Sequence, residues 1–307
     1  MPPERRFADV SVIIPAYHAA NTIARALKSV AAQTLRPREV IVVDDGSDDG
    51  TYEAALAMAE RMNGVALKVV RQAHHGAGAA RNRALAESAQ PYLAFLDADD
   101  EWLPEKLERS LCLLREKNSD LVSHNYTMIE GSHQRTIDCA HHFLSGEDPF
   151  IPYVLRGYIA TSTVVVRRDL LLDAGGFDPS LPSGQDYELW LVVISTPGVR
   201  FHVFPETLTR YHVIAHSISS QVDLRLRCAL GILHRHVHRL KGRRRLPLYV
   251  VWMRTVIIHN QAFLAHLSRK EYVRALWDCL GTPVSLISTA RALVVKPQKR
   301  PNFLNND

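Results

Sequence analysis

Residues 10–34 read VSVIIPAYHAANTIARALKSVAAQT, an apolar run that stops at a proline and is followed by a helical pattern. The run from Val10 to Ile14 predicts a buried strand. Beyond Asn21, which can cap a helix, apolar side chains recur every three or four positions, as they do on one face of an amphipathic helix. The sequence therefore begins with a strand-then-helix unit.

The same unit recurs through the first hundred residues. Apolar runs at 40–43, 67–70 and 92–96 predict three more strands, and residues 51–62 and 79–88 predict helices between them. Strands that alternate with helices imply right-handed crossovers and a parallel sheet. We therefore expect an α/β fold in which ligands bind at the carboxyl ends of the strands.

The rest of the chain is less regular at first and then becomes helical. Strands are predicted at 122–126 and 163–167, separated by an irregular loop, and Gln185 and Asp186 are predicted to open a helix. From about Val222 the pattern is helical and basic. We predict a catalytic domain over residues 1–219 and a basic helical extension over residues 220–307.

Composition and charge narrow the class of protein. Hydrophobic residues make up 47% of the chain and charged residues 22%, which is typical of a folded protein and excludes a disordered one. The four cysteines form no CxxC motif, and we find neither a signal peptide nor a run of about 20 apolar residues. We expect a cytoplasmic protein. Its charge is uneven, because residues 1–214 carry −7 and residues 215–307 carry +12.

Acidic clusters follow two strands of the predicted sheet. DDGSDD covers residues 44–49, and DADD covers residues 97–100. Each cluster alone fits turn chemistry, but carboxylates that meet at one sheet edge need a cation or hydrogen-bond donors. The pair of clusters therefore favours a metal or nucleotide site. We interpret Asp100 and Glu101 as first-turn charges of a helix near Pro104.

One motif is a weak match to a dinucleotide-binding fingerprint. GAGAAR, residues 76–81, resembles GxGxxG, but it lacks the third glycine and follows the third predicted strand instead of the first. We do not interpret it as a dinucleotide site.

Five segments considered together carry a specific resemblance: VSVIIPAYHAANTIARALKSVAAQT, VIVVDDGSDDGT, GAGAARNRAL, YLAFLDADDEW and GGFDPSLPSGQDYELWL. In order and spacing they resemble the family-two inverting glycosyltransferases over roughly residues 9–219. The resemblance implies the GT-A fold, a three-layer sandwich with a mostly parallel central sheet. It also implies inverting transfer from a nucleotide-diphosphate sugar, usually a UDP-sugar, with Mn²⁺ or Mg²⁺. The acceptor would be a hydroxyl of a cell-surface glycan, glycolipid or polysaccharide precursor.

The resemblance also implies roles for single residues. Asp45 matches the acid that recognises the base, Asp99 the ligand of the divalent ion, and Asp186 the catalytic base. The residues expected to lie beside the nucleotide-sugar are Pro15, Ala16, Tyr17, Asp44, Asp45, Arg81 and Asp97.

Elementary chemistry agrees with these roles. A hard divalent cation with oxygen ligands neutralises charge on a departing diphosphate. Strand alternation would send Asp97 and Asp99 to the same side. A single carboxylate such as Asp186 can accept the proton of an acceptor hydroxyl. The alternative for Asp186 is a helix N-terminal carboxylate, whose removal would lower stability and not rate.

The chain departs from the family pattern at several positions. Gln185 stands where Glu is common, and YHVIAHSIS, residues 211–219, replaces a YRxHxxSxS pattern. Whether His212 or His216 contacts the metal or the diphosphate stays open.

The basic region has several interpretations. Residues 235–245 contain six Lys or Arg beside an apolar stretch, which favours docking on the inner face of an anionic membrane. A solvated helical bundle or an oligomer contact is the alternative. No nucleic-acid motif accompanies the charge, so we expect no nucleic-acid partner.

Two other functions fit the sequence less well. A nucleotidyltransferase would need a basic, glycine-rich phosphate loop near the N-terminus, and PAYHAAN, residues 15–21, is not one. A non-catalytic nucleotide-sugar-binding or assembly protein is disfavoured because the chain keeps Asp45, Asp97, Asp99 and Asp186. The donor sugar, the acceptor and the oligomeric state cannot be read from the sequence.

Overall fold

The computed structural model describes residues 7–143, 148–214, 221–243, 245–295, 297 and 299–304. The strands in these residues are β1 (Phe7–Ala16), β2 (Arg36–Asp44), β3 (Ala66–Arg71), β4 (Tyr92–Phe95), β5 (Glu101–Trp102), β6 (Leu121–Glu130), β7 (His133–Ile137), β8 (Val165–Arg167) and β9 (Phe201–His212). They form one sheet in the order β3-β2-β1-β4-β8-β6-β9-β5, with β7 paired to β6.

The α-helices of the described residues fall into two groups. Seven follow or precede strands: α1 (Ile23–Ala31), α2 (Thr51–Leu56), α3 (Ala77–Glu87), α4 (Lys106–Glu116), α5 (Phe150–Arg156), α6 (Arg168–Ala174) and α7 (Gln185–Ser195). Three more come after the last strand: α8 (Val222–His236), α9 (Pro247–Ser268) and α10 (Tyr272–Ala292).

The first half of the sheet is the parallel sheet that the sequence predicts. Strand β1 lies between β2 and β4 and is parallel to both, and β2 is parallel to β3. The second half is mixed, because β8 runs antiparallel to both β4 and β6, while β6 and β9 are parallel. All four strands predicted in the first hundred residues are confirmed.

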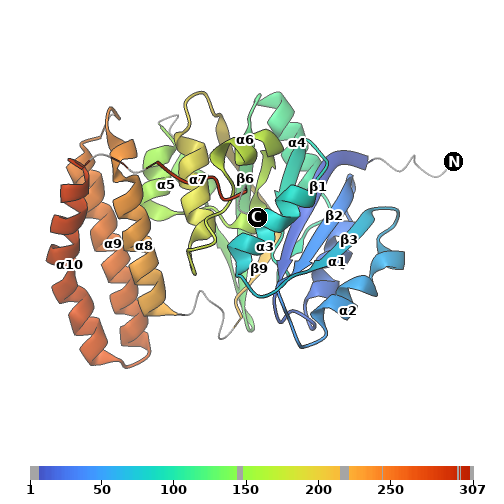
Figure 1. Ribbon diagram of the computed structural model, residues 1–307, viewed down its shortest axis with the longest axis horizontal. Helices are drawn as coiled ribbons and strands as arrows, with labels where there is room; N and C mark the ends of the chain where they lie inside the picture. The colour runs from blue at the N-terminus through green and yellow to red at the C-terminus, as the bar shows by residue number, and fades with distance from the viewer. Residues whose placement is uncertain are drawn as a thin grey trace.

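Helices cover both faces of the sheet, so the fold has three layers (Figure 1). Alternate residues of β1 enter different cores, because successive side chains of a strand point to opposite faces. Val12 packs in the core that contains Leu27 of α1. Ile13 packs in the core that contains Leu85 of α3 and Trp190 of α7. All are buried, and each fully buried large apolar side chain stabilises the fold by about 1.5–3 kcal/mol. The predicted three-layer α/β sandwich is confirmed.

Some local predictions were wrong. The region predicted as an irregular loop after residue 126 contains the rest of β6, the hairpin to β7 and helix α5. The hairpin closes through Gly131 and Ser132 between the paired residues Glu130 and His133, and Gly131 has the positive φ that such a turn favours. The predicted helix at 51–62 ends as α2 at Leu56 and is followed by a 3₁₀ turn.

The long strand β9 was also missed. Its apolar pattern is broken by Pro205 and Glu206, and these two residues sit where the pairing with β6 shifts between His124 and Asn125. A bulge of this kind interrupts the alternation by which a strand is recognised in a sequence.

The C-terminal helices lie side by side at the end of the molecule away from α1 and α2 (Figure 1), and α9 also packs against α5. The helical pattern predicted from about Val222 is confirmed by α8, which begins there. The predicted boundary at residue 219 lies outside the described residues, so the division into two domains stays a prediction. No helix of the described ranges combines the length and the apolar character needed to cross a bilayer.

Candidate active site

A cavity of about 1440 Å³ opens at the carboxyl ends of β1, β2 and β4 and extends to the helices α8 and α9. This is the position expected for a ligand site in an α/β sheet. Eight of the residues singled out in the sequence line this one cavity: Pro15, Ala16, Tyr17, Asp45, Arg81, Asp97, Asp99 and Asp186.

The Asp45 carboxylate organises the loop that enters α3. It is buried, and it accepts hydrogen bonds from Gln72 Nε2 (2.7 Å), His75 N (3.0 Å) and Gly76 N (2.7 Å). His74 Nδ1 lies 2.9 Å from its Oδ2. Because a carboxylate offers about four acceptor positions, these contacts nearly saturate it. Asp45 therefore holds the segment 72–76 against the end of β2.

An exposed aromatic stack lies at the same end of the cavity. The ring of Tyr17, 47% exposed, lies 4.1 Å from the His18 ring on one side and 4.1 Å from the His74 ring on the other. Asp44, by contrast, is buried and is not among the residues that line the cavity. Its carboxylate accepts from Ser47 N and pairs with Arg71 at 3.0 Å. The predicted nucleotide contact of Asp44 stays a prediction.

Three carboxylates surround one buried cation, Arg81. This residue is 5% exposed, and its Nη2 lies 2.6 Å from Asp97 Oδ1. Burial alone would lower the pKa of the Arg81 guanidinium, but the charges of Asp97, Asp186 and Asp99 outweigh burial and raise it. Arg25, which donates to Asp99 O, is a second cation near these acids. Two positive charges against three acids leave an excess of negative charge in this part of the cavity.

Asp97 and Asp99 lie in a turn beyond β4 and not on the strand itself, because β4 ends at Phe95 and Asp100 N donates to Asp97 O at 3.0 Å. The argument from strand alternation was therefore wrong, although both side chains line the cavity. Burial, and then the charge of Asp97, raise the pKa of Asp99 to about 6. Two acids that resist joint ionisation are suited to hold a divalent cation.

The interpretation of Asp100 and Glu101 as first-turn charges of a helix is wrong. Helix α4 begins only at Lys106, and Glu101 belongs to strand β5. The Asp100 carboxyl group is buried and accepts from Ser162 Oγ (2.5 Å) and His212 N (2.9 Å). Burial, and then the neighbouring acids, raise its pKa well above the usual value. Through these two contacts Asp100 fixes the turn that carries Asp97 and Asp99.

Asp186 lies at the N-terminal end of α7, as predicted. Its Oδ2 accepts from Thr161 Oγ1 at 2.9 Å, and its Oδ1 accepts from Tyr187 N at 2.8 Å. Trp190, one turn further along the helix, is fully buried and anchors α7 in the core. Asp186 is therefore held by its own helix and by the segment that precedes β8.

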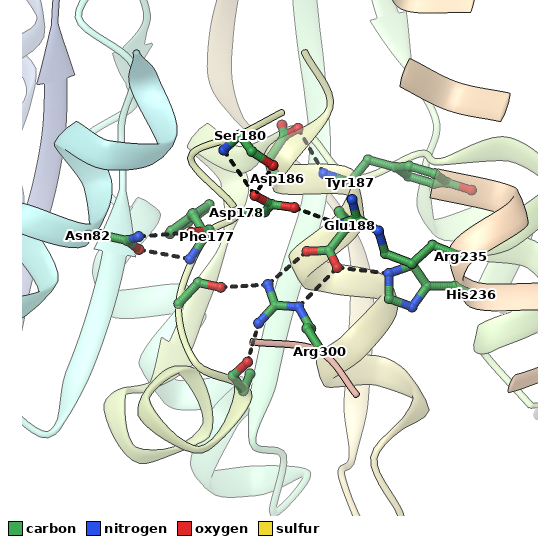
Figure 2. Close-up of polar contacts among 12 residues, drawn as sticks. Asn82, Phe177, Asp178, Ser180, Asp186, Tyr187, Glu188, Arg235, His236 and Arg300 are labelled. Carbon is green, nitrogen blue, oxygen red and sulfur yellow. Dashed lines mark hydrogen bonds and ion pairs between the residues drawn. The ribbon is translucent and has the colours of Figure 1, made fainter. Parts of the chain in front are cut away.

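Behind Asp186, a buried acid ties α7 to distant parts of the chain (Figure 2). Glu188 pairs with Arg300 through two hydrogen bonds of 2.9 and 2.7 Å, and with His236 Nε2 at 2.7 Å. Burial alone would raise the pKa of Glu188, but the hydrogen bonds from His236 and Arg300 lower it to about 2. The residues 299–304 and helix α8 thus both brace the helix that carries Asp186.

The segment between α6 and α7 is fixed from two sides (Figure 2). Asn82 of α3 donates to Phe177 O (2.8 Å) and accepts from Phe177 N (2.7 Å). The carboxylate of Asp178 accepts from Ser180 and pairs with Arg235 of α8 at 2.5 Å. A Cβ at Gly176 would lie 2.6 Å from atoms of both Asn82 and Leu304, so only glycine fits there.

The histidine predictions have mixed outcomes. His212 Nε2 lies 3.3 Å from Glu101 and does not line the cavity, so a contact with metal or diphosphate stays a prediction. His216 lies outside the described residues. Within the described ranges, no group of three or more His, Cys, Asp or Glu is placed to hold a metal by itself.

Sequence reasoning missed several residues of the site. Thr161, Ser162 and Glu188 have no motif of their own, and the wall formed by α8 and α9 contributes further lining residues. The sequence held one indication for Glu188. It is an acid between Tyr187 and Leu189 in a helix with a buried apolar face, so a buried carboxylate that needs partners could have been expected there.

The comparisons with known proteins agree with this geometry. The profile described as "Glycosyl transferase family 2" matches residues 11–169, about half of the chain. The amylovoran biosynthesis glycosyltransferase AmsB of Erwinia amylovora is 32% identical over 66% of this chain and 69% of its own. An Escherichia coli relative, the UDP-Glc:alpha-D-GlcNAc-diphosphoundecaprenol beta-1,3-glucosyltransferase WfgD, is 29% identical over 69% of this chain and 79% of its own.

Solved structures share the fold at low sequence identity. S. aureus TarS 1-349 in complex with UDP-GlcNAc has a TM-score of 0.67 and 17% identity, over 96% of this chain and 89% of that one. The mannosyltransferase PcManGT of Pyrobaculum calidifontis, in complex with GDP-Man and Mn²⁺, has a TM-score of 0.61 and 20% identity, over 95% and 88% of the two chains.

Substitution of Glu188 tests the brace behind Asp186. We expect Glu188→Gln to lower the free energy of unfolding at pH 7 by about 1.5–3 kcal/mol, because hydrogen bonds to a charged group are lost. The pKa of Glu188 in the folded protein, about 2, lies below the ordinary 4.5, so its stabilisation is present above pH 4.5 and is lost as the pH falls towards 2. In urea titrations, the difference between the two proteins should therefore shrink from pH 5 to pH 3.

The matched control is Glu60→Gln, at an exposed position, which should stay within about 0.5 kcal/mol of the parent. A difference between parent and Glu188→Gln that does not change with pH would contradict the assigned pKa.

Proposed function

Because this chain belongs to glycosyl transferase family 2, we propose that it moves a sugar from a UDP-sugar to a hydroxyl of a polysaccharide or lipid-linked glycan precursor, with inversion at the anomeric carbon. The observation that carries the proposal is the meeting of Asp97, Asp99 and Asp186 around Arg81 in one cavity. The names of the relatives, which refer to amylovoran and to a diphosphoundecaprenol acceptor, support the class of product.

The donor nucleotide is proposed to bind at the end of the cavity that holds Tyr17. Both faces of the Tyr17 ring are covered by the imidazoles of His18 and His74, so we expect a base to extend this aromatic stack at one of the histidines. Pro15 and Ala16 continue the wall. Asp45 shapes this end by holding the loop 72–76, and the resemblance gives it the recognition of uracil. The UDP-GlcNAc bound in the TarS neighbour supports uridine as the nucleoside.

A divalent cation, Mn²⁺ or Mg²⁺, is proposed to bind at Asp99, with Asp97 beside it. The fit rests on two adjacent carboxylates in a region of excess negative charge, since the pKa of Asp99 is raised by burial and by Asp97. Such an ion neutralises the charge of a leaving diphosphate. Phosphate oxygens and water would supply the other ligands. The Mn²⁺ in the PcManGT neighbour supports a divalent ion.

Asp186 is proposed to act as the general base. An acceptor hydroxyl is a weak nucleophile until its proton is accepted, and Asp186 presents a carboxylate that lines the cavity. Thr161 Oγ1 and Tyr187 N orient this carboxylate. With one base and no second carboxylate assigned as a nucleophile, the sugar would transfer by direct displacement, which inverts the anomeric centre.

Substitution of Asp186 tests the base. Asp186→Asn keeps the size of the side chain and can still accept from Thr161, so we expect the fold and the affinity for UDP to be preserved. Turnover should fall by about 10²- to 10⁴-fold, the usual contribution of a positioned base. Release of UDP from a donor panel and calorimetry with UDP measure the two quantities. The control Asp173→Asn, at an exposed position of α6, should keep full turnover. Unchanged turnover in Asp186→Asn would reject the assignment.

Removal of the metal tests the second role. We expect a chelator to abolish transfer and added Mn²⁺ to restore it, because the leaving diphosphate then loses and regains its counter-charge. Asp99→Asn should need a much higher Mn²⁺ concentration for half-maximal rate, whereas Asp173→Asn should match the parent. Mn²⁺ binding in the presence of UDP can be followed by electron paramagnetic resonance. Full activity in the chelator would refute a metal-dependent transfer.

The outer face of α9 and α10 is proposed to dock on an anionic membrane, where a lipid-linked acceptor is found. Large apolar side chains are exposed along α10, among them Trp277, which is 68% exposed. Exposed Lys270 and Arg291 lie at or near the two ends of α10, and residues 215–307 carry a charge of +12. The exposed apolar residues of this face of α10 are Val273, Leu276, Trp277, Leu280, Val284 and Ile287. Apolar and aromatic side chains combined with basic charge are typical of interfacial helices.

Vesicle binding tests the docking face. We expect the protein to co-sediment with phosphatidylglycerol vesicles and not with phosphatidylcholine vesicles, because each basic residue adds about 1 kcal/mol at an anionic surface. Trp277→Ser combined with Leu280→Ser should release most of the bound protein without loss of stability, since both positions are exposed. The same double substitution should leave UDP binding unchanged. If the substitution instead converts a dimer to a monomer in gel filtration, the face belongs to a second copy and the membrane proposal fails.

A further inference from the structure

The charge along the cavity wall reverses between the sheet and the C-terminal helices. Near the sheet the wall carries the acids Asp97, Asp99 and Asp186. Where α5, α8 and α9 form the wall, the charged lining residues are Arg156, Arg225, Arg254 and Arg269. Apart from Arg81, which pairs with Asp97, the cations of the lining come from these C-terminal elements and from the end of α5. The proposed donor chemistry uses the acidic part and leaves the basic part without a role.

Arg254 is the buried member of the basic part. It is 6% exposed, its Nη1 donates to Leu155 O at 3.0 Å, and its guanidinium lies 5.1 Å from the centre of the Tyr187 ring. Its Nε is buried and has no hydrogen-bond partner, and no carboxylate of the described residues pairs with it. Burying a charge without a counter-ion is costly, so a guanidinium in a cavity wall indicates an anionic ligand.

A purely structural role accounts for only part of this arrangement. By donating to Leu155 O, Arg254 satisfies a carbonyl of the last turn of α5, as cations near helix C-termini often do. That contact and a hydrogen bond to the side chain of Tyr187 leave part of the five N–H groups unused, the buried Nε among them. The next residue, Arg156, is exposed and lines the same cavity, and the described residues give it no ion pair. Arg254 of α9 therefore donates to the residue that precedes Arg156 at the C-terminal end of α5, and both arginines line the cavity.

Arg254, in the basic part of the wall, packs on the residue that directly follows the proposed base in the sequence. Tyr187 follows Asp186 directly in α7, and its hydroxyl donates to Val154 O of α5 at 2.9 Å. Arg254 packs on the ring of this same tyrosine. Asp186 and Arg254 thus flank Tyr187 in the same cavity. An acceptor sugar that presents a hydroxyl to Asp186 would direct its far side towards Arg254.

The helices that contribute the arginines also contribute an apolar lining. The apolar side chains from α8 and α9 include Val222, Leu226, Ala229, Ile232, Ile258 and Ala262. One cavity therefore combines a carboxylate base, cations and an apolar surface. A sugar that carries phosphate groups on its anomeric oxygen, esterified to a lipid, presents a group for each of the three.

We propose that Arg254 and Arg156 form an anion subsite for the phosphates of a lipid-linked sugar diphosphate acceptor, whose lipid lies along α8 and α9. The proposal rests on the proposed transferase function and deepens it by naming the acceptor class. It assigns these arginines to acceptor binding, and they take no part in donor binding.

The test compares two acceptors that differ only in the diphosphate. One is the dodecyl ester of α-D-N-acetylglucosaminyl diphosphate, the other is dodecyl α-D-N-acetylglucosaminide. Arg254→Gln and Arg156→Gln should each weaken binding of the diphosphate by about 10- to 100-fold, the usual effect of losing a charge-assisted hydrogen bond. Binding of the neutral glycoside and of UDP should not change. Arg254→Lys, which keeps the charge, should recover part of the binding.

Calorimetric binding keeps this test independent of turnover. Arg227→Gln, at an exposed position of α8 that does not line the cavity, is the matched control and should bind both acceptors like the parent. If transfer fails with every donor while the arginine effect persists, the proposed function fails and the anion subsite stands. An equal loss for both acceptors in Arg254→Gln, with no loss in Arg156→Gln, would assign Arg254 to the structure of α5 and overturn the subsite. Unchanged diphosphate binding in both variants would overturn it as well.

Discussion

The ion pair between the buried guanidinium of Arg81 and the carboxylate of Asp97 is the interaction on which the site depends. It places a positive charge beneath the carboxylates Asp97, Asp99 and Asp186, which would otherwise repel one another in a shared cavity. Even with Arg25 beside Asp99, two cations do not neutralise three acids, and a divalent ion would balance the remaining negative charge. Arg81 also stands in α3, where Asn82 grips the segment leading to α7, so the same turn of helix sets both the charge and the position of the proposed base.

Residues that do not line the cavity stabilise the helix that carries Asp186. Glu188, one turn into α7, is locked by His236 from α8 and Arg300 from the last described residues. The part of the chain after β9 therefore has two structural roles, and different residues fulfil them. It braces α7 through the buried acid, and it completes the cavity through α8 and α9. In the proposed function, the sheet would build the donor end of the cavity and the C-terminal helices the acceptor end.

Much of the architecture could be predicted from local patterns, because the apolar runs that become β1, β2 and β4 are largely buried and are short and continuous. Residues 15–17, Asp45, Asp97 and Asp99 meet because the ends of parallel strands share an edge, whereas Arg81 and Asp186 reach the cavity from α3 and α7. Prediction failed where distant contacts decide. Asp100 turns inward only because Ser162 and His212 donate to it from 62 and 112 residues away. Strand β9 loses its alternation at a bulge opposite β6. Arg254 lines the cavity because α9 packs against α5, and no spacing in the sequence predicts that packing.

The anchoring of Arg300 beneath α7 has a consequence for biosynthesis. The Arg300 guanidinium pairs with Glu188, 112 positions earlier in the chain. This contact, which stabilises the helix that carries the proposed base, can form only after residue 300 has been translated. During elongation the strands of the parallel sheet can pair while Glu188 still lacks its partner. The nascent polypeptide would pass through a stage in which the parallel strands have paired and α7 is not yet fixed, until the segment that contains Arg300 has been translated.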